Sequence, residues 1–238
     1  MDNAVYALLN RQSGLLSEFD VVANNIANAS TPGFRREGVV FAEHVRALAP
    51  VEPDLALADA AGRVIDLAQA PLKRTGGALD FAIEGEGFFQ IGTPEGIQLT
   101  RAGSFVMNDA GEIVTADGHA LLDAGGAPVT VPPGSGALRL APDGTLSGTT
   151  GPIADLGLVL PADPTRLSHR AGTRFAAEGG TVPAETSRIL QGFVEGSNAD
   201  AVTEVARMIE VQRSYEMGQS LLTSEDERIR TVVTTLGS

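Results

Sequence analysis

The sequence predicts an α+β fold in which two heptad helices, one at each end, pair as a coiled-coil-like assembly domain around a central antiparallel all-β domain. Both ends of the chain repeat apolar residues at heptad spacing. The stretch between them consists of short β-branched or aromatic runs separated by glycine, proline and aspartate. We divide the 238 residues into an N-terminal assembly helix (1–30), an extended connector (31–74), a central β domain (75–190) and a C-terminal assembly helix (191–238).

The N-terminal helix is predicted from apolar residues in alternating steps of three and four, with the polar Gln12 in one position. The apolar heptad positions hold Val5, Leu8, Leu15, Phe19, Val22 and Ile26. A neighbouring apolar row consists of Leu9, Leu16 and Ala23. Because this row widens the stripe, we expect the helix to contact more than one neighbour. The helix should end near Asn28, since Pro32 and Gly33 favour a turn.

The connector and the β domain follow from a change in residue pattern. Residues 34–73 are rich in alanine and proline and show no sustained period, which predicts an extended segment. Strands are expected at 88–91, 97–100, 104–107, 113–115, 129–131, 138–140 and 156–159. Turns are expected at 108–111, 116–118 and 142–144, where aspartate precedes glycine. This spacing is typical of an antiparallel all-β unit.

The C-terminal helix is predicted over about residues 200–235 by a second heptad series, capped by Asn198 or Asp200. Its main positions hold Ala201, Met208, Tyr215, Leu222, Ile229 and Leu236. Its intermediate positions hold Val211, Gly218 and Val232, but also Glu204 and Glu225, so the series is less regular than the first. Apolar stripes of this width need partners. We therefore expect the two helices to pair, neighbouring subunits to cover them, and many copies to form a tube with the β domains outside.

Composition excludes several classes of partner. The formal net charge is −13 at pH 7, so a phosphate backbone or an anionic bilayer would be repelled. We therefore expect no nucleic-acid partner and no membrane surface. No run of eighteen apolar residues occurs, which predicts no membrane insertion. The N-terminus lacks the basic and apolar regions of a signal peptide. A cytoplasmic location follows unless export uses a route without a cleaved signal.

The sequence predicts no catalytic, cofactor or metal site. The chain has no cysteine, and its histidines, His44, His119 and His169, lack the spacing of metal ligands. Nucleophile-elbow, Walker and zinc-protease motifs are absent. The pair Glu84 and Glu86 could suggest glycoside cleavage, but solvated strand-edge carboxylates are the simpler interpretation. We therefore predict a protein that is not an enzyme and that uses no cofactor.

The asparagines at the end of the first helix are the least ordinary polar residues. Asn24, Asn25 and Asn28 either fray and cap the helix or form hydrogen bonds that set the register between helices or subunits. We include them in the candidate assembly interface, with the apolar heptad positions of both helices. The candidate residues are Leu8, Leu15, Phe19, Val22, Asn24, Asn25, Ile26, Asn28, Met208, Val211, Tyr215, Leu222, Ile229 and Val232.

Several motifs resemble those of the flagellar rod and hook protein family. The N-terminal signature lies at residues 20–28 (DVVANNIAN) and 31–36 (TPGFRR). Segments that resemble the start of the family's β domain lie at 69–80 (QAPLKRTGGALD), 85–89 (GEGFF) and 100–105 (TRAGSF). The closing motif and helix correspond to 192–198 (GFVEGSN) and 208–216 (MIEVQRSYE). Gly77 and Ala199 depart from the family's usual residues, and residues 120–186 match only loosely.

The resemblance implies a self-assembling structural subunit of the flagellar basal-body rod. The opening residues and modest length are most similar to proximal rod members. A distal rod or hook subunit is the alternative within the family, and a peptidoglycan-acting module is an alternative outside it. The implied partners are other axial proteins, including proximal and distal rod subunits and further copies of this chain. The resemblance also implies export by the flagellar type III apparatus without a cleaved signal peptide, and assembly in the periplasm.

Overall fold

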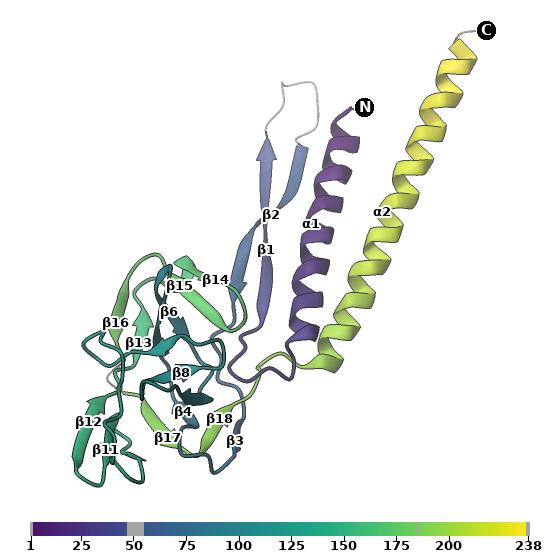
Figure 1. Ribbon diagram of the computed structural model, residues 1–238. Coiled ribbons are helices and arrows are strands. Elements are labelled where there is room, and N and C mark those ends of the chain that lie inside the picture. The colour runs from purple at the N-terminus through teal and green to yellow at the C-terminus, as the bar shows by residue number, and fades with distance from the viewer. Residues whose placement is uncertain (1, 47–54, 185, 237–238) are drawn as a thin grey trace. The chain divides into compact units, whose positions relative to one another are not determined.

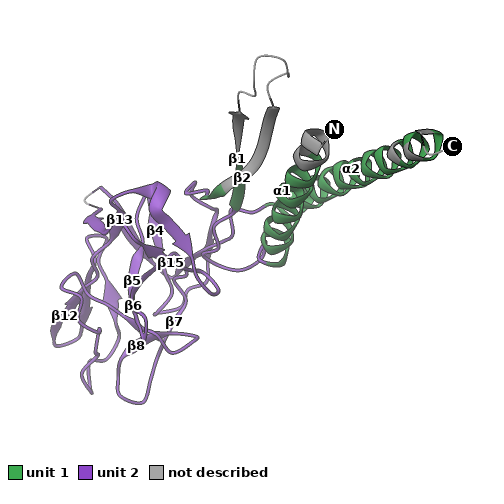
Figure 2. Ribbon diagram, turned by 90° about the horizontal axis from the view of Figure 1, so that it is seen from above, with its two compact units in different colours: residues 1–27, 37–64, 200–238 green, residues 28–36, 65–199 purple. Residues whose placement is uncertain are grey.

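The structure is a computed structural model that describes residues 2–46, 55–184 and 186–236 (Figure 1). Its elements confirm the α+β class, with a helix at each end and strands between them. The chain divides into two compact units, coloured green and purple in Figure 2. Unit 1 comprises residues 1–27, 37–64 and 200–238, and unit 2 comprises residues 28–36 and 65–199.

Unit 1 contains both long helices, α1 (Asp2–Ala27) and α2 (Ala201–Leu236). The α1 helix ends at the predicted turn, where the Thr31 amide donates to the Asn28 carbonyl at 3.0 Å. The α2 helix begins directly after Asp200, whose Oδ1 accepts a hydrogen bond from the Thr203 amide at 2.8 Å. A carboxylate in this position satisfies one of the helix's free N–H groups. Local sequence signals therefore place both of these helix ends.

The same unit contains a two-stranded sheet of β1 (Glu37–Arg46) and β2 (Leu55–Ile65), and β1 also contacts α1. These strands occupy much of the segment that we expected to be an extended connector. The sequence missed their pairing because β2 is rich in alanine, which has low intrinsic β propensity. Pairing and tertiary contacts outweigh that local preference.

Unit 2 is built from short strands and one 3₁₀ turn, η1 (Pro164–Arg166). The strands are β3 (Leu72–Arg74), β4 (Phe81–Glu84), β5 (Phe89–Thr93), β6 (Gly96–Thr100), β7 (Phe105–Met107), β8 (Ile113–Thr115), β9 (Ala120–Leu121), β10 (Arg139–Leu140), β11 (Thr145–Gly148), β12 (Gly151–Asp155), β13 (Val159–Pro161), β14 (Leu167–His169), β15 (Arg174–Ala177), β16 (Thr181–Pro183), β17 (Arg188–Gln191) and β18 (Phe193–Glu195).

The largest sheet of unit 2 has seven strands in the order β14-β15-β6-β5-β9-β8-β7, paired antiparallel. Smaller sheets are β10-β11-β12, β13-β16, β17-β4 and β18-β3. The last two strands of the unit thus pair with the first two, β17 with β4 and β18 with β3. This return of the chain to its starting strands closes the unit. Unit 2 extends beyond the limits of 75–190 that we expected for the β domain, on both sides.

The three predicted turns are confirmed, because Gly111, Gly118 and Gly144 all have positive φ angles. Of the expected strand at 156–159, only Val159 lies in a strand, β13. The expected strand at 129–131 is wrong. The Val129 amide donates to the Leu121 carbonyl at 2.9 Å, whereas the Val131 amide donates to the Gly111 carbonyl at 2.8 Å. Because the segment bonds to two different parts of the sheet in turn, it forms no continuous ladder. Its valines are nevertheless buried, which explains their apolar pattern.

Two apolar clusters form the core of unit 2. The larger one contains Phe81, Ile83, Phe89, Phe105, Ile113, Leu121, Val129, Val131, Leu146, Leu156, Leu158 and Ile189. The smaller one contains Phe88, Leu99, Leu167 and Phe175. Phe105 makes an edge contact with Phe89 at a centroid distance of 5.6 Å. Aromatic pairs of this geometry stabilise the core beyond the area that they bury.

Candidate assembly interface

The two terminal helices pack side by side within unit 1 and run antiparallel. Three polar contacts establish their direction, because residue numbers rise on α2 as they fall on α1. Asn25 Nδ2 donates to Glu204 Oε2 at 3.1 Å, and Arg207 Nη2 lies 2.8 Å from Glu18 Oε1. Farther along, Gln12 Nε2 donates to the Tyr215 carbonyl at 3.1 Å.

Most predicted heptad residues of the two helices are buried or partly buried. Leu15, Val22 and Val211 are buried. Partly buried members are Leu8, Ile26, Met208, Tyr215 and Leu222. An antiparallel pair therefore buries the apolar seam that each helix carries. The heptad spacing places the apolar side chains on one face of each helix, and the partner helix covers that face.

Some predicted residues lie elsewhere. Phe19 is 37% exposed and Val232 is 45% exposed, although the heptad spacing placed both in the seam. Asn24 is also exposed, and the Ile229 side chain lies outside the described residues. Conversely Val21, which the heptad pattern omitted, is only 1% exposed. The α1 helix contacts β1 as well as α2, so one heptad seam does not account for all of its buried positions.

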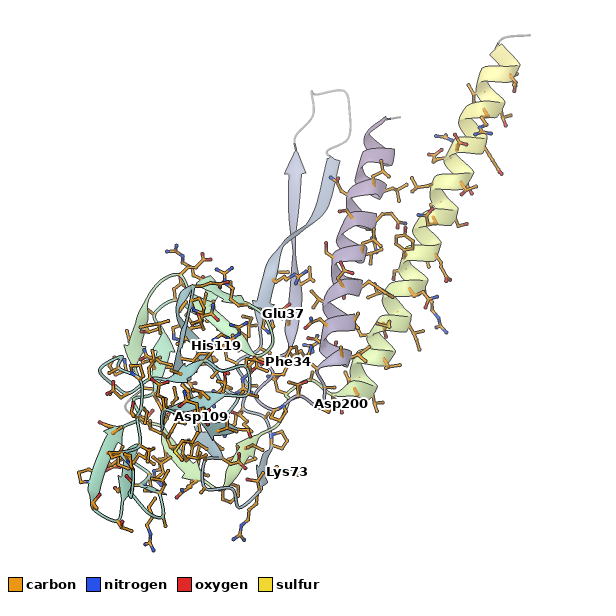
Figure 3. All side chains as sticks on the ribbon, viewed as in Figure 1. Phe34, Glu37, Lys73, Asp109, His119 and Asp200 are labelled. Atoms are coloured by element: carbon orange, nitrogen blue, oxygen red, sulfur yellow. The ribbon has the colours of Figure 1, made fainter. Side chains whose placement is uncertain are left out.

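Asn25 forms the best-connected polar contact of unit 1. It is completely buried, and its Nδ2 donates to the Glu37 carbonyl at 2.9 Å as well as to Glu204. Its Oδ1 accepts from the Glu37 amide at 3.0 Å. Figure 3 labels Glu37, at the start of β1. One amide side chain therefore joins α1, β1 and α2. Asn28 instead lies in the turn after α1, where the Thr31 hydroxyl donates to its side chain at 3.2 Å.

Glu204 is a site residue that sequence reasoning missed. It is 1% exposed and lies in the helix contact, bonded to Asn25. A signal was present, because Glu204 interrupts the second heptad series at an intermediate position. We interpreted that interruption as an irregularity. In the structure it is one half of a buried polar pair.

An apolar groove runs along one side of the helix pair, with a volume of 460 Å³. It is lined by Leu15, Leu16, Phe19, Val211, Gln212, Tyr215 and Glu216. Leu16, from the flanking row of the sequence pattern, is 51% exposed here. The α1 helix thus uses one apolar stripe for α2 and presents a second one to the groove.

A separate buried site in unit 2 joins three segments through charge. Glu195, at the end of β18, is fully buried between two guanidinium groups. Arg35 Nη2 lies 2.7 Å from Glu195 Oε1, and Arg101 Nη1 lies 3.0 Å from Glu195 Oε2. The Ala70 amide also donates to Glu195 Oε1 at 2.8 Å, and Arg101 Nη2 donates to the Gly85 carbonyl at 2.8 Å.

This cluster carries more positive than negative charge. Burial, together with the nearby charge of Arg35, lowers the pKa of Arg101 to about 10, because these effects outweigh the attraction of Glu195. The guanidinium stays protonated at neutral pH. Arg35 Nε and Nη1 are buried without a hydrogen-bond partner among the described residues. A buried ion cluster of this kind fixes geometry more than it adds stability.

Backbone hydrogen bonds strengthen the same junction. The Gly33 amide donates to the Glu195 carbonyl at 2.9 Å, and the Arg36 amide donates to Asn198 Oδ1 at 2.6 Å. Asn198 Nδ2 in turn donates to the Asp66 carbonyl at 2.9 Å. Gly33 has φ +75°, and a β-carbon there would overlap the backbone of Ala102. Only glycine allows this approach.

The junction explains why three separate motifs occur in the sequence. The segments that resemble the family, TPGFRR, TRAGSF and GFVEGSN, supply Arg35, Arg101 and Glu195 respectively. The segment that follows α1 and the segment that precedes α2 are thereby fastened to each other within unit 2. Sequence reasoning used these motifs only for the resemblance and did not identify the cluster.

The residues that could act in catalysis or metal binding do not lie together in a site. His119 Nε2 lies 2.9 Å from Arg174 Nη1, whereas the His169 ring packs against Phe34 and Phe175. The His44 side chain lies outside the described residues. Within the described part of the chain, no three His, Cys, Asp or Glu residues are placed to hold a metal. Nor does any described helix have the length and apolar content to cross a membrane.

Three protein-family models match the chain. "Flagella basal body rod protein" matches residues 3–35, and "Flagellar hook protein FlgE/F/G D1 domain" matches residues 82–148. "Flagellar basal body rod FlgEFG protein C-terminal" matches residues 190–235. The first and third models cover α1 and most of α2, and the second covers β4 to β11 of unit 2.

Curated relatives match over their whole length. The flagellar basal-body rod protein FlgF of Mesorhizobium japonicum is 36% identical, over 98% of this chain and 98% of the relative. FlgF of Caulobacter vibrioides is 35% identical, over 100% of this chain and 99% of the relative. The rod protein FlgG of Bacillus subtilis is 29% identical, over 98% of both chains. With its two terminal helices, its central β unit and these full-length similarities, the chain belongs to the flagellar basal-body rod protein family.

Proposed function

We propose that the chain is a structural subunit of the flagellar basal-body rod, that it occupies the proximal part of the rod, and that α1 and α2 join it to other axial subunits. The observation that carries the assembly mechanism is the apolar surface that the helix pair leaves open. Leu16 is half exposed beside the groove, and α2 carries several further exposed apolar residues. They are Val202, Val205, Ile209, Met217 and Leu221.

These residues flank the helix contact on two different sides. Successive residues of a helix are about 100° apart, so Val205 and Ile209 lie on the side of Gln212, toward the groove. Met217 and Leu221 fall on the other side of the seam. A helix pair with two different apolar flanks can be covered by a different neighbour on each flank. Head-to-tail contacts give open helical assemblies when the rotation between subunits does not close a ring, whereas a single self-complementary patch gives a closed dimer.

The proposed occupants of both flanks are terminal helices of other rod subunits, including further copies of this chain. Packing between copies would then be coiled-coil-like, with the heptad spacing shared among several helices. The family membership of the chain supports axial proteins of the proximal and distal rod as partners. The proposed role is structural and involves no catalysis or cofactor.

The route to the rod is part of the same proposal. Because the chain belongs to the flagellar basal-body rod protein family, we propose export by the flagellar type III apparatus without a cleaved signal peptide, and assembly in the periplasm. Detection of the intact N-terminal residues by mass spectrometry of purified basal bodies would support this route. A shortened N-terminus would contradict it.

A charge in the groove tests the assembly mechanism. Leu16→Asp should abolish swimming in a strain that lacks its own copy of the gene, because a carboxylate would be buried between subunits. Burial of a leucine side chain is worth about 2 kcal/mol, so each contact should weaken at least tenfold. Spreading in soft agar and electron microscopy of basal bodies measure the effect.

The matched control is Ser13→Asp, which places the same charge on an exposed position of α1 that does not line the groove. It should swim normally. Normal rods with Leu16→Asp would refute assembly through the groove. The proximal position is tested separately by imaging the rod with a tagged subunit, where density in the distal rod or the hook would refute it.

A further inference from the structure

Gln12 and Gly218 interrupt the apolar seams of α1 and α2, and the structure brings them together. We infer that these two residues form a register lock, in which the Gln12 side chain occupies a notch that only glycine leaves open. The lock sets how far α1 is displaced along α2.

The contact is close and buried. Gln12 is 7% exposed, and its Nε2 donates to the Tyr215 carbonyl at 3.1 Å. A β-carbon on Gly218 would overlap Gln12 Nε2 and would lie 3.1 Å from Gln12 Cδ. Any side chain at position 218 would therefore displace the glutamine amide from its place.

Glycine at this position has a specific geometric effect. Tyr215 and Gly218 are three residues apart, so they lie one turn apart on the same face of α2. Without a side chain at 218, the Tyr215 carbonyl can accept a second hydrogen bond from outside the helix. Glycine lowers the stability of a helix interior relative to alanine, so its presence here calls for such a compensating contact.

The notch occurs once in α2. The equivalent heptad positions on either side of it are Val211 and Glu225, and Gly218 is the one glycine between Ala201 and Leu236. A slip of one heptad, about 10 Å, would place Gln12 against one of these side chains. The amide would then lose its acceptor and meet a β-carbon. Without the contact between Gln12 and Gly218, a slip of one heptad would cost much less, because the apolar residues of the seam repeat at the same interval.

The lock provides specificity more than stability. Gln12 Oε1 is buried without a hydrogen-bond partner among the described residues, which is unfavourable in itself. Polar residues at single seam positions specify register in coiled coils at a similar cost. The groove that we propose as the subunit contact includes Leu15, Val211 and Tyr215, so its shape depends on this register. This last step rests on the proposed function, whereas the lock itself does not.

A double-mutant cycle on the full chain tests the lock. Gly218→Ala is expected to lower the urea midpoint of helix unfolding in the natural chain, because the new methyl group displaces Gln12. In the Gln12→Ala background the same change should raise the midpoint. The folding constant should then increase about fivefold, the usual gain from glycine to alanine in an unobstructed helix. Ser220→Ala, on the exposed face of α2, is the control and should have the same small effect in both backgrounds.

Circular dichroism at 222 nm follows the two helices, since the other described elements are strands, turns and one 3₁₀ segment. All variants are compared in a fixed concentration of trimethylamine N-oxide that completes the helical signal of the natural chain. A change of sign between backgrounds supports the lock. An equal gain from Gly218→Ala in both backgrounds overturns it, as would a natural chain that never becomes helical.

Swimming tests the consequence for assembly. The double variant Gln12→Ala/Gly218→Ala should keep stable helices but spread less in soft agar, because its register is no longer specified. Normal spreading would overturn the role of the register in assembly. If strains without the gene swam normally, the proposed function would fail, but the stability cycle would still decide whether the lock exists.

Discussion

Asn24 and Asn25 are adjacent in sequence but have opposite environments. Asn24 is exposed, whereas Asn25 is buried and bonds to both backbone groups of Glu37 and to the carboxylate of Glu204. Neighbouring helical residues point about 100° apart, so only one of the two can face β1 and α2. The roles of individual asparagines therefore depend on which side of the helix is covered.

This pair allows a prediction at the scale of single residues. Asn25→Leu should destabilise unit 1 by about 3 kcal/mol, because it leaves a buried N–H, a buried carbonyl and a buried carboxylate without their partner. Urea unfolding of the helical signal, in the same fixed concentration of trimethylamine N-oxide for both proteins, measures the loss. We also expect impaired swimming, with the β strands of unit 2 still folded.

Asn24→Leu is the matched control, with the same chemical change on the exposed neighbour. It should leave both stability and swimming close to normal. Equal effects of the two changes would show that the buried hydrogen bonds of Asn25 have no special role.

At the scale of elements, α2 begins at a charged cap. Hydrogen bonds from the backbone and side chain of Thr203 lower the pKa of Asp200 below its usual value of 3.8. The ionised carboxylate is thus more favourable in the folded helix than in the unfolded chain. Its contribution is complete above pH 3.8 and is lost as the pH falls through the lowered value.

We therefore predict an acid-dependent start of α2. Below about pH 4 the helical signal of the natural chain should lose stability relative to Asp200→Asn, because asparagine also caps a helix but does not titrate. Urea midpoints measured between pH 2 and pH 7 give the difference between the two proteins. The difference should grow toward low pH, and a constant difference would show that the cap's charge is irrelevant.

At the scale of the whole molecule, the two compact units differ in how well they bury their apolar residues. Unit 2 has two closed clusters of buried residues. The helices of unit 1 leave large apolar side chains in solvent, including Met217, which is 66% exposed. Long helices gain most of their stability from partners. In a free subunit the helices should therefore be much less stable than the β unit.

Limited proteolysis of a dilute monomer tests this difference. We expect rapid cleavage within residues 1–27 and 200–238, and a resistant fragment of about residues 28–199, which contains all of unit 2. Mass spectrometry identifies the fragments, and sedimentation establishes that the species is monomeric. Equal resistance of both ends would refute folding of the helices on assembly, without affecting membership of the family.

The sequence by itself determined the fold class, the limits of both long helices, the turns and the family. These depend on local signals: heptad spacing, a capping aspartate, and glycines with positive φ at 111, 118 and 144. The motifs TPGFRR, TRAGSF and GFVEGSN also revealed the family before their contacts were known.

Only the tertiary structure decided which polar residues are buried together. Glu195 lies between Arg35 and Arg101, and Gln12 lies against Gly218, although the members of each contact are far apart in the chain. The same is true of β1 and β2, because no periodic pattern in the sequence predicted that these strands pair. Spacing along a chain indicates which face a side chain occupies, but its partner depends on contacts between distant segments, which a local pattern does not encode.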